Sequence, residues 1–141
     1  MRFLRAHAAL TRELSSRLEA LHELTLSDFD ALVQLYYAEG QRMRRIDLAR
    51  SVLLTASGIT RLLDGLEAGG FVTKERCDAD ARVTYAALTK AGVKKIEEAR
   101  ESHLADIEEL FGSRFSRQER EHLAELLGRL PLAHTSEECS R

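Results

Sequence analysis

The sequence predicts a mostly helical protein with one small β-hairpin, and three observations support this fold class. Apolar residues recur at helical i, i+3 and i+4 spacing through most of the chain. Two short runs rich in Val, Thr and Tyr flank the turn-forming segment CDADA at residues 77–81. The composition, with 44% hydrophobic and 31% charged residues in a chain of 141, is that of an ordinary globular domain and argues against disorder.

The chain begins with two predicted helices. Residues 3–21 place charged residues between apolar ones, which predicts a long amphipathic helix that needs a partner surface. Thr25 or Ser27 can cap a second helix that runs through Tyr37, and a turn is expected at residues 41–45. The apolar stripe of the first helix consists of Phe3, His7, Leu10, Leu14, Leu18 and Leu21.

Two shorter helices are predicted next, packed across a tight turn. Small Ala49 lies where the two helices would cross, and Gly69 with Gly70 ends the second one. This arrangement is typical of a helix-turn-helix. The inner faces are expected to consist of Ile46, Leu48, Ala49 and Val52 in the first helix, and of Ile59, Leu62, Leu63 and Leu66 in the second.

The outward face of the second helix is short and polar. Ser57, Thr60, Arg61 and Asp64 form this stripe, which suits contact with phosphates and base edges in a major groove of DNA. Thr55, just before this stripe, is a further candidate for DNA contact, and either Thr55 or Ser57 can instead, or in addition, cap the helix. The alternative for the whole stripe is the solvated side of an amphipathic helix that binds nothing.

A β-hairpin is predicted after this helix. The first strand begins at residues 71–73, the chain turns at residues 77–81, and residues 83–88 return as the second strand. Arg76 and Arg82 are then expected near the tip. Together with the preceding helices, the hairpin predicts a winged helix-turn-helix over residues 26–89.

The rest of the chain predicts two more helices and a tail. Thr89 can cap a helix from Lys90 to Leu110, and Ser116 with Glu119 forms a capping box for the last helix. Residues 131–141 are polar and expected to be flexible. The apolar stripe of the last helix consists of Leu123, Leu126, Leu127 and Leu130.

The chain is expected to form one structural unit, residues 1–141, that pairs with a second copy. Apolar stripes at both ends cannot all be covered by the middle segment, so we expect residues 1–24 and 90–130 to serve as dimerisation helices of a homodimer. Two-fold symmetry would place two recognition helices about 34–36 Å apart and predicts a near-palindromic DNA site.

The net charge of −2 hides a basic segment. Residues 41–90 contain nine Lys or Arg and six Asp or Glu, a balance of +3, so the remainder carries −5. Basic side chains of this segment are candidates for phosphate contacts, which give salt-dependent affinity with little sequence preference. They are Arg42, Arg44, Arg45, Lys74 and Arg76.

Several other function classes find no support in the sequence. No run approaches the roughly 20 apolar residues of a spanning helix, and no signal peptide is evident, so we expect a cytoplasmic protein. Two cysteines form no disulfide framework, and five histidines lack metal-ligand spacing. No catalytic or cofactor motif is present. A redox sensor based on the Cys77 thiol is a minor alternative, because Asp78 and Asp80 oppose thiolate formation.

The chain resembles the MarR family of winged-helix transcriptional regulators from about residue 5 to residue 130. The wing pattern of Asp, Arg and alternating apolar residues that ends in Leu-Thr-x-x-Gly appears as Asp80, Arg82, Val83, Tyr85, Leu88, Thr89 and Gly92. The recognition-helix pattern appears over residues 57–67, SGITRLLDGLE. The sequence departs from the family at Ala81, where many members have a second arginine, and at Leu53, a turn position often held by glycine.

The resemblance implies an obligate dimer that binds double-stranded DNA, with the Arg82 side chain in the minor groove and Asp80 steadying the wing tip. It also implies a small-molecule effector site between the dimer helices and the DNA-binding part, and the candidate residues for this site are Tyr36, Tyr37, His7 and His22. We therefore expect a ligand-responsive repressor. The alternative is a helical protein-interaction module without a DNA role.

Overall fold

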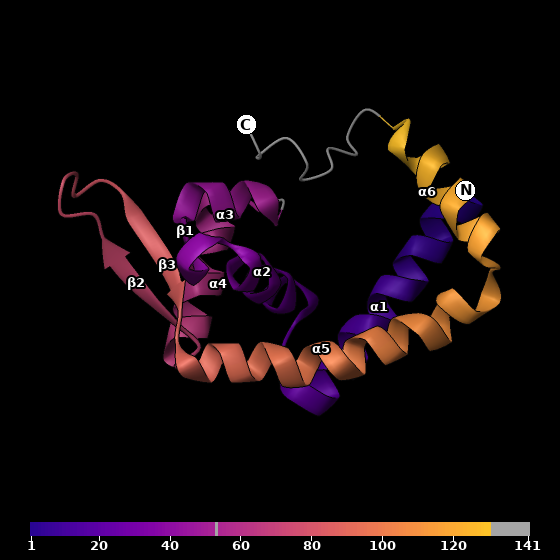
Figure 1. The fold of residues 1–141 in the computed structure, drawn as a ribbon, viewed down its shortest axis with the longest axis horizontal. Helices are drawn as coiled ribbons and strands as arrows, with labels where there is room; N and C mark the ends of the chain where they lie inside the picture. Colours follow the sequence, from indigo (N-terminus) through magenta and orange to yellow (C-terminus); the bar gives the residue numbers. More distant parts are fainter. Residues whose placement is uncertain (53, 131–141) are drawn as a thin grey trace. The chain divides into compact units, whose positions relative to one another are not determined.

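The computed structural model describes residues 1–52 and 54–130 and has the predicted fold class, helices with one small sheet (Figure 1). The helices are α1 (Arg2–His22), α2 (Leu26–Tyr37), α3 (Arg45–Ser51), α4 (Ala56–Ala68), α5 (Lys90–Leu110) and α6 (Arg117–Gly128), the 3₁₀ turns are η1 (Glu39–Gln41) and η2 (Gly112–Arg114), and the strands are β1 (Arg42–Arg44), β2 (Val72–Arg76) and β3 (Thr84–Leu88).

The sheet has three antiparallel strands in the order β1-β3-β2. The predicted hairpin of β2 and β3 is confirmed. The prediction of a plain turn at residues 41–45 is wrong, because Arg42–Arg44 pair with β3 and α3 already begins at Arg45. In the register, Tyr85 of β3 lies between Arg44 of β1 and Glu75 of β2.

Of the two residues predicted as possible caps of the second helix, Thr25 caps α2, and the predicted cap of α6 is confirmed. The Thr25 hydroxyl accepts a hydrogen bond from the Asp28 amide, and the Asp28 carboxylate accepts one from the Thr25 amide. Ser116 and Glu119 form the same reciprocal pair at the start of α6. Each pair satisfies amide donors that the first helical turn leaves without a partner.

Buried side chains of α3 and α4 belong to the same hydrophobic core as those of α2. Leu48, Ile59 and Leu63 are at most 1% exposed, as the apolar spacing predicts. The prediction that Ile46 points inward is wrong, because this residue is 59% exposed. Each residue turns a helix by about 100°, so Ile46 lies about 200° from Leu48 and faces outward.

One short segment joins the end of α4 to the start of α5. Gly70 takes a left-handed φ of 78°, and the Phe71 amide donates to the Leu66 carbonyl at 2.9 Å, which closes α4. The Thr89 hydroxyl then donates to the Gly70 carbonyl at 2.6 Å and accepts from the Gly92 amide at 3.0 Å. The wing and α5 are therefore both attached to the last turn of the recognition helix.

The chain divides into two compact units, and the second begins at Leu104. The first unit holds α1 to α4, the sheet and most of α5. In the second unit the Phe111 and Phe115 rings lie 5.0 Å apart, and Arg120 pairs with Glu108 at 3.4 Å. Among residues 1–52 and 54–130, no helix combines the length and apolar character needed to cross a membrane.

Candidate nucleic-acid interface

The cap and the first two turns of α4 present three of the predicted DNA-binding residues. The Thr55 hydroxyl accepts a hydrogen bond from the Gly58 amide at 3.1 Å and lies 3.2 Å from the Ser57 hydroxyl. Thr55 is thus the helix cap, one of the two roles considered for it. Thr55, Ser57 and Arg61 are all exposed to solvent.

A cavity of about 300 Å³ between α4 and the wing brings together four further predicted residues. They come from three elements, α3, α4 and β2. The Arg45 guanidinium donates to the Thr60 hydroxyl at 3.1 Å, which links the two helices of the helix-turn-helix. The residues that line the cavity are Arg45, Thr60, Leu63, Lys74, Arg76 and Thr84.

Lys74 is expected to contact phosphate, but the structure surrounds its ammonium group with carboxylates. Lys74 Nζ lies 2.6 Å from Asp64 Oδ1 and 2.8 Å from Glu67 Oε2. Hydrogen bonds to Asp64 and then Glu67 raise the pKa of Lys74, and the hydrogen bond from Lys74 lowers the pKa of Glu67. Both directions indicate that the charged forms are stabilised at neutral pH.

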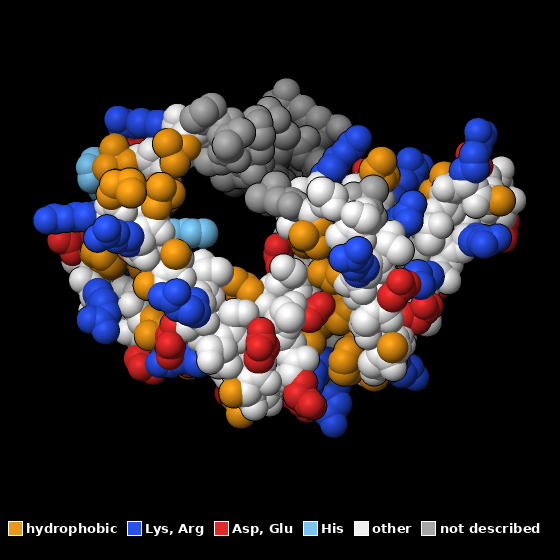
Figure 2. Space-filling view, turned by 180° about the vertical axis from the view of Figure 1, so that it is seen from behind, with side chains coloured by type: hydrophobic (Ala, Val, Ile, Leu, Met, Phe, Trp, Pro, Cys, Tyr) orange, Lys and Arg blue, Asp and Glu red, His pale blue; other side chains and the backbone are white. Residues whose placement is uncertain are grey.

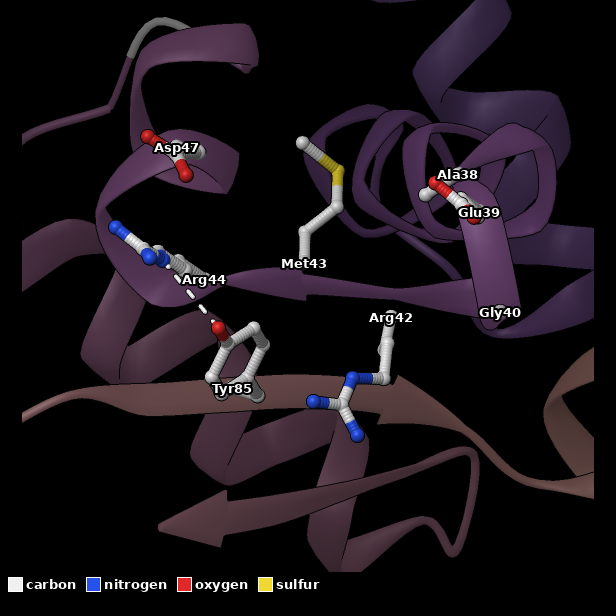
Figure 3. Close-up of a pocket in the computed structure, with 8 residues that line it drawn as sticks. All are labelled: Ala38, Glu39, Gly40, Arg42, Met43, Arg44, Asp47 and Tyr85. Atoms are coloured by element: carbon white, nitrogen blue, oxygen red, sulfur yellow. Dashed lines mark hydrogen bonds between the residues drawn. The ribbon is translucent and has the colours of Figure 1, made fainter. Parts of the chain in front are cut away.

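The outer face of the sheet holds two arginines around one tyrosine (Figure 3). Arg44 Nε donates to the Tyr85 hydroxyl at 3.3 Å, and the Arg42 guanidinium lies 4.5 Å from the centre of the Tyr85 ring. Arg42 also pairs with Glu75 at 3.6 Å. The hydrogen bond to Tyr85 raises the pKa of Arg44, so the guanidinium stays charged. The three residues belong to an open depression of about 580 Å³.

The wing tip places Arg82 in solvent. Its side chain is 93% exposed, and its amide donates to Asp80 Oδ1 at 3.0 Å. Arg82 Nε also donates to Asp80 Oδ1, at 3.3 Å, so Asp80 holds both the backbone of the turn and one edge of the exposed guanidinium. In Figure 2 the wing lies at the right and carries Lys and Arg side chains along its length.

Two of the four candidate effector residues contact each other, because the Tyr36 and Tyr37 rings lie edge to face with their centres 5.2 Å apart. The Tyr36 hydroxyl donates to Glu97 at 3.1 Å, which raises the pKa of Tyr36, and the Tyr37 ring faces Arg100 at 5.6 Å. His22 Nε2 lies 2.6 Å from the Ser102 hydroxyl. His7 lines a shallow depression on α1. Of the depressions on α1, on the outer face of the sheet and between α4 and the wing, only the one on α1 includes any of the four.

The remaining sequence expectations concern metal and thiol chemistry and one turn. In the described ranges, no group of three or more His, Cys, Asp and Glu side chains is placed to hold a metal ion. The Cys77 thiol is unpaired and half-buried. Ala81 is exposed beside Arg82. Leu53, whose turn conformation was in question, lies outside the described residues, as do residues 131–141.

Two features of this surface are missing from the sequence prediction. Tyr85, treated there only as part of the wing pattern, contacts both Arg42 and Arg44, and Asp64 and Glu67 hold Lys74. The sequence alone shows that Asp64 and Glu67, at i, i+3 spacing, lie on one face of the helix. Their partner on a strand, ten residues beyond Asp64, was not marked by any local spacing.

Comparison with known proteins identifies related sequences and structures. The model of the MarR family matches residues 24–84. The HTH-type transcriptional regulator MhqR of Bacillus subtilis (strain 168) is 31% identical over 111 residues, covering 79% of this chain and 74% of MhqR. The crystal structure of AbsC, a MarR family transcriptional regulator from Streptomyces coelicolor, matches with a TM-score of 0.84 and 28% identity over 89% of this chain and 84% of AbsC. Sco3205 from Streptomyces coelicolor, crystallised in complex with DNA, shares the fold with a TM-score of 0.86 at 23% identity, over 89% of this chain and 79% of Sco3205.

Proposed function

Because the chain belongs to the MarR family of DNA-binding transcriptional regulators, we propose that it acts as a homodimeric, ligand-responsive repressor on a near-palindromic operator. The observation that supports this most strongly is the shared exposure of Arg61 on α4 and Arg82 on the wing tip. Arg61 can reach base edges in the major groove, and Arg82 can enter the adjacent minor groove. Ser57, Thr60, Arg44, Arg45 and Arg76 are proposed as further DNA contacts.

The apolar surface of the terminal helices supports the dimer. Phe3, Leu4 and Leu21 of α1 are 54 to 67% exposed, and Leu126 of α6 is 41% exposed. Side chains of this size are normally removed from water, and a second copy of the chain would cover them. Hydrophobic side chains are visible on the surface of these helices in Figure 2.

Repression follows if the bound dimer occupies a promoter, and release requires a ligand that distinguishes two shapes of the dimer. Such a ligand must bind the released shape more tightly than the DNA-competent one, since equal affinity would shift nothing. Tyr36, Tyr37, His7 and His22 stay candidates for this site, and the Tyr36 and Tyr37 rings already contact each other in one protomer.

A duplex titration tests the proposal. Operator fragments selected from a random pool should share a two-fold consensus, and their affinity should fall steeply between low and moderate salt. Arg82→Ala and Arg61→Ala should each weaken binding, Arg61→Ala with a change in sequence preference. Arg117→Ala on α6, which removes an exposed arginine paired with Glu121, is the matched control: it should sediment as the wild type does and bind DNA with the same affinity. Absence of salt-dependent binding would instead favour a protein-interaction module.

A further inference from the structure

One lysine joins the wing to the recognition helix. Lys74 is the third residue of β2, and its ammonium group lies within 2.8 Å of carboxylates on α4, Asp64 and Glu67. The Lys74 amide adds a third link, because it donates to Glu67 Oε1 at 3.3 Å. We call these three residues the Lys74 clamp. One residue is thus held to α4 through both its side chain and its backbone.

The two carboxylates are a liability on a surface that meets DNA. Asp64 shares the outward stripe of α4 with Thr60 and Arg61, and its side chain is 57% exposed. A carboxylate there repels phosphates over roughly 10 Å at 0.1 M salt. The Lys74 ammonium offsets that charge at contact distance.

We infer that Lys74 is a positioning residue, which fixes the base of the wing to the recognition helix and screens Asp64 and Glu67 from DNA, and that it contacts no phosphate itself. The inference rests on the proposed function, since it assigns a role in DNA binding. This positioning role takes the place of the phosphate contact that the sequence predicts for Lys74. Arg82 at the wing tip then keeps a defined distance from α4, because the strand that leads to it is anchored.

The accessibility of the neighbouring cations agrees with this division of roles. The Lys74 side chain is 31% exposed, against 93% for Arg82. Arg76 is two residues further along β2, on the same face of the strand, and lines the same cavity. No acidic partner is found for Arg76 within the described part of the chain. We therefore expect Arg76 to contact phosphate, and it serves as the comparison for Lys74.

A double-mutant cycle on operator DNA tests the clamp. Lys74→Met should weaken binding, and adding Asp64→Asn in that background should recover affinity by at least about threefold, because it removes an unscreened carboxylate. In the wild-type background Asp64→Asn should bring no gain. In the matched control Arg76→Met, which should lower the salt slope by about 0.9, Asp64→Asn should behave as in the wild type. If Asp64→Asn changes affinity by the same factor in the wild type and in Lys74→Met, the inference is overturned.

A measurement without DNA separates this inference from the proposed function. Lys74→Met should raise the pKa of Glu67 towards its ordinary value of 4.5, as followed by NMR of the carboxyl group. An unchanged Glu67 pKa would show that no clamp exists in solution. If the wild type bound no duplex, the proposed function would fail, and the Glu67 titration would still decide whether Lys74 holds α4.

Discussion

Position 92 must be a glycine because the backbone of Phe71 approaches it closely. A Cβ atom at this position would lie 2.0 Å from the Phe71 carbonyl oxygen, which is closer than any real contact. The same turn is tied by the Thr89 hydroxyl to Gly70. The Leu-Thr-x-x-Gly motif of the wing therefore has a packing reason: it lets the first turn of α5 sit directly on the end of α4.

Replacing Gly92 by alanine should lower the free energy of unfolding by about 2–3 kcal/mol, because the new methyl group displaces either α5 or the Phe71 backbone. The measurement is urea denaturation of the full chain. Gly65→Ala in α4 is the matched control, since a Cβ there meets nothing within 4 Å. It should raise stability by about 0.5–1 kcal/mol, as alanine restricts the unfolded chain. Equal effects of the two substitutions would contradict the packing argument.

At the scale of the element, the first turn of α4 combines a role in folding with a proposed role in DNA binding. Thr55 caps the helix through the Gly58 amide, and the first turn of a helix leaves further amides without a partner inside the helix. A helix N-terminus attracts anions, so the turn can meet a phosphate without losing its cap. The two roles of Thr55 are compatible because the side chain is exposed.

Two substitutions at Thr55 separate these roles. Thr55→Ala removes the cap and should cost about 1 kcal/mol of stability, measured by thermal or urea unfolding. Thr55→Asp keeps a capping oxygen and should preserve stability, yet its negative charge should weaken operator binding about tenfold through repulsion of phosphates. Thr55→Ser is the control that should keep both properties. Wild-type operator affinity in Thr55→Asp would show that this turn does not face DNA.

The sequence predicts those elements whose signals are local. Ser116 stands three residues before Glu119, so this capping box is predicted from spacing alone, whereas spacing leaves both Thr25 and Ser27 open as the cap of α2. Strand β1 spans only Arg42–Arg44, too short to show a period of two, and it exists because β3 offers an open edge. The contacts of Lys74 and Tyr85 join separate elements, and only the fold brings those residues together.

At the scale of the whole molecule, the exposed apolar side chains of α1 and α6 predict the oligomeric state. Leu4→Glu or Leu126→Glu should shift sedimentation from dimer to monomer, because a charge buried in the interface would be unpaired. Operator affinity should then fall by about 100-fold or more, since each half-site is held by one head alone. Ile46→Glu on α3 is the control for sedimentation, as Ile46 is 59% exposed but lies outside the terminal helices. A wild-type chain that sediments as a monomer at micromolar concentration would refute the dimer.

A dimer with two fixed recognition helices should also be sensitive to the spacing of its half-sites. The heads of such a dimer lie about 34–36 Å apart, one turn of duplex, so both helices enter the major groove on the same side. Inserting about five base pairs between the half-sites turns one of them to the opposite side and should reduce affinity to that of a single half-site, a loss of about 100-fold. Changing the central base pairs without altering their number is the control and should cost far less. Affinity is measured by fluorescence anisotropy with labelled duplexes. An affinity unchanged by the insertion would mean that the two heads bind independently. The proposed release by a ligand that alters their spacing would then be contradicted.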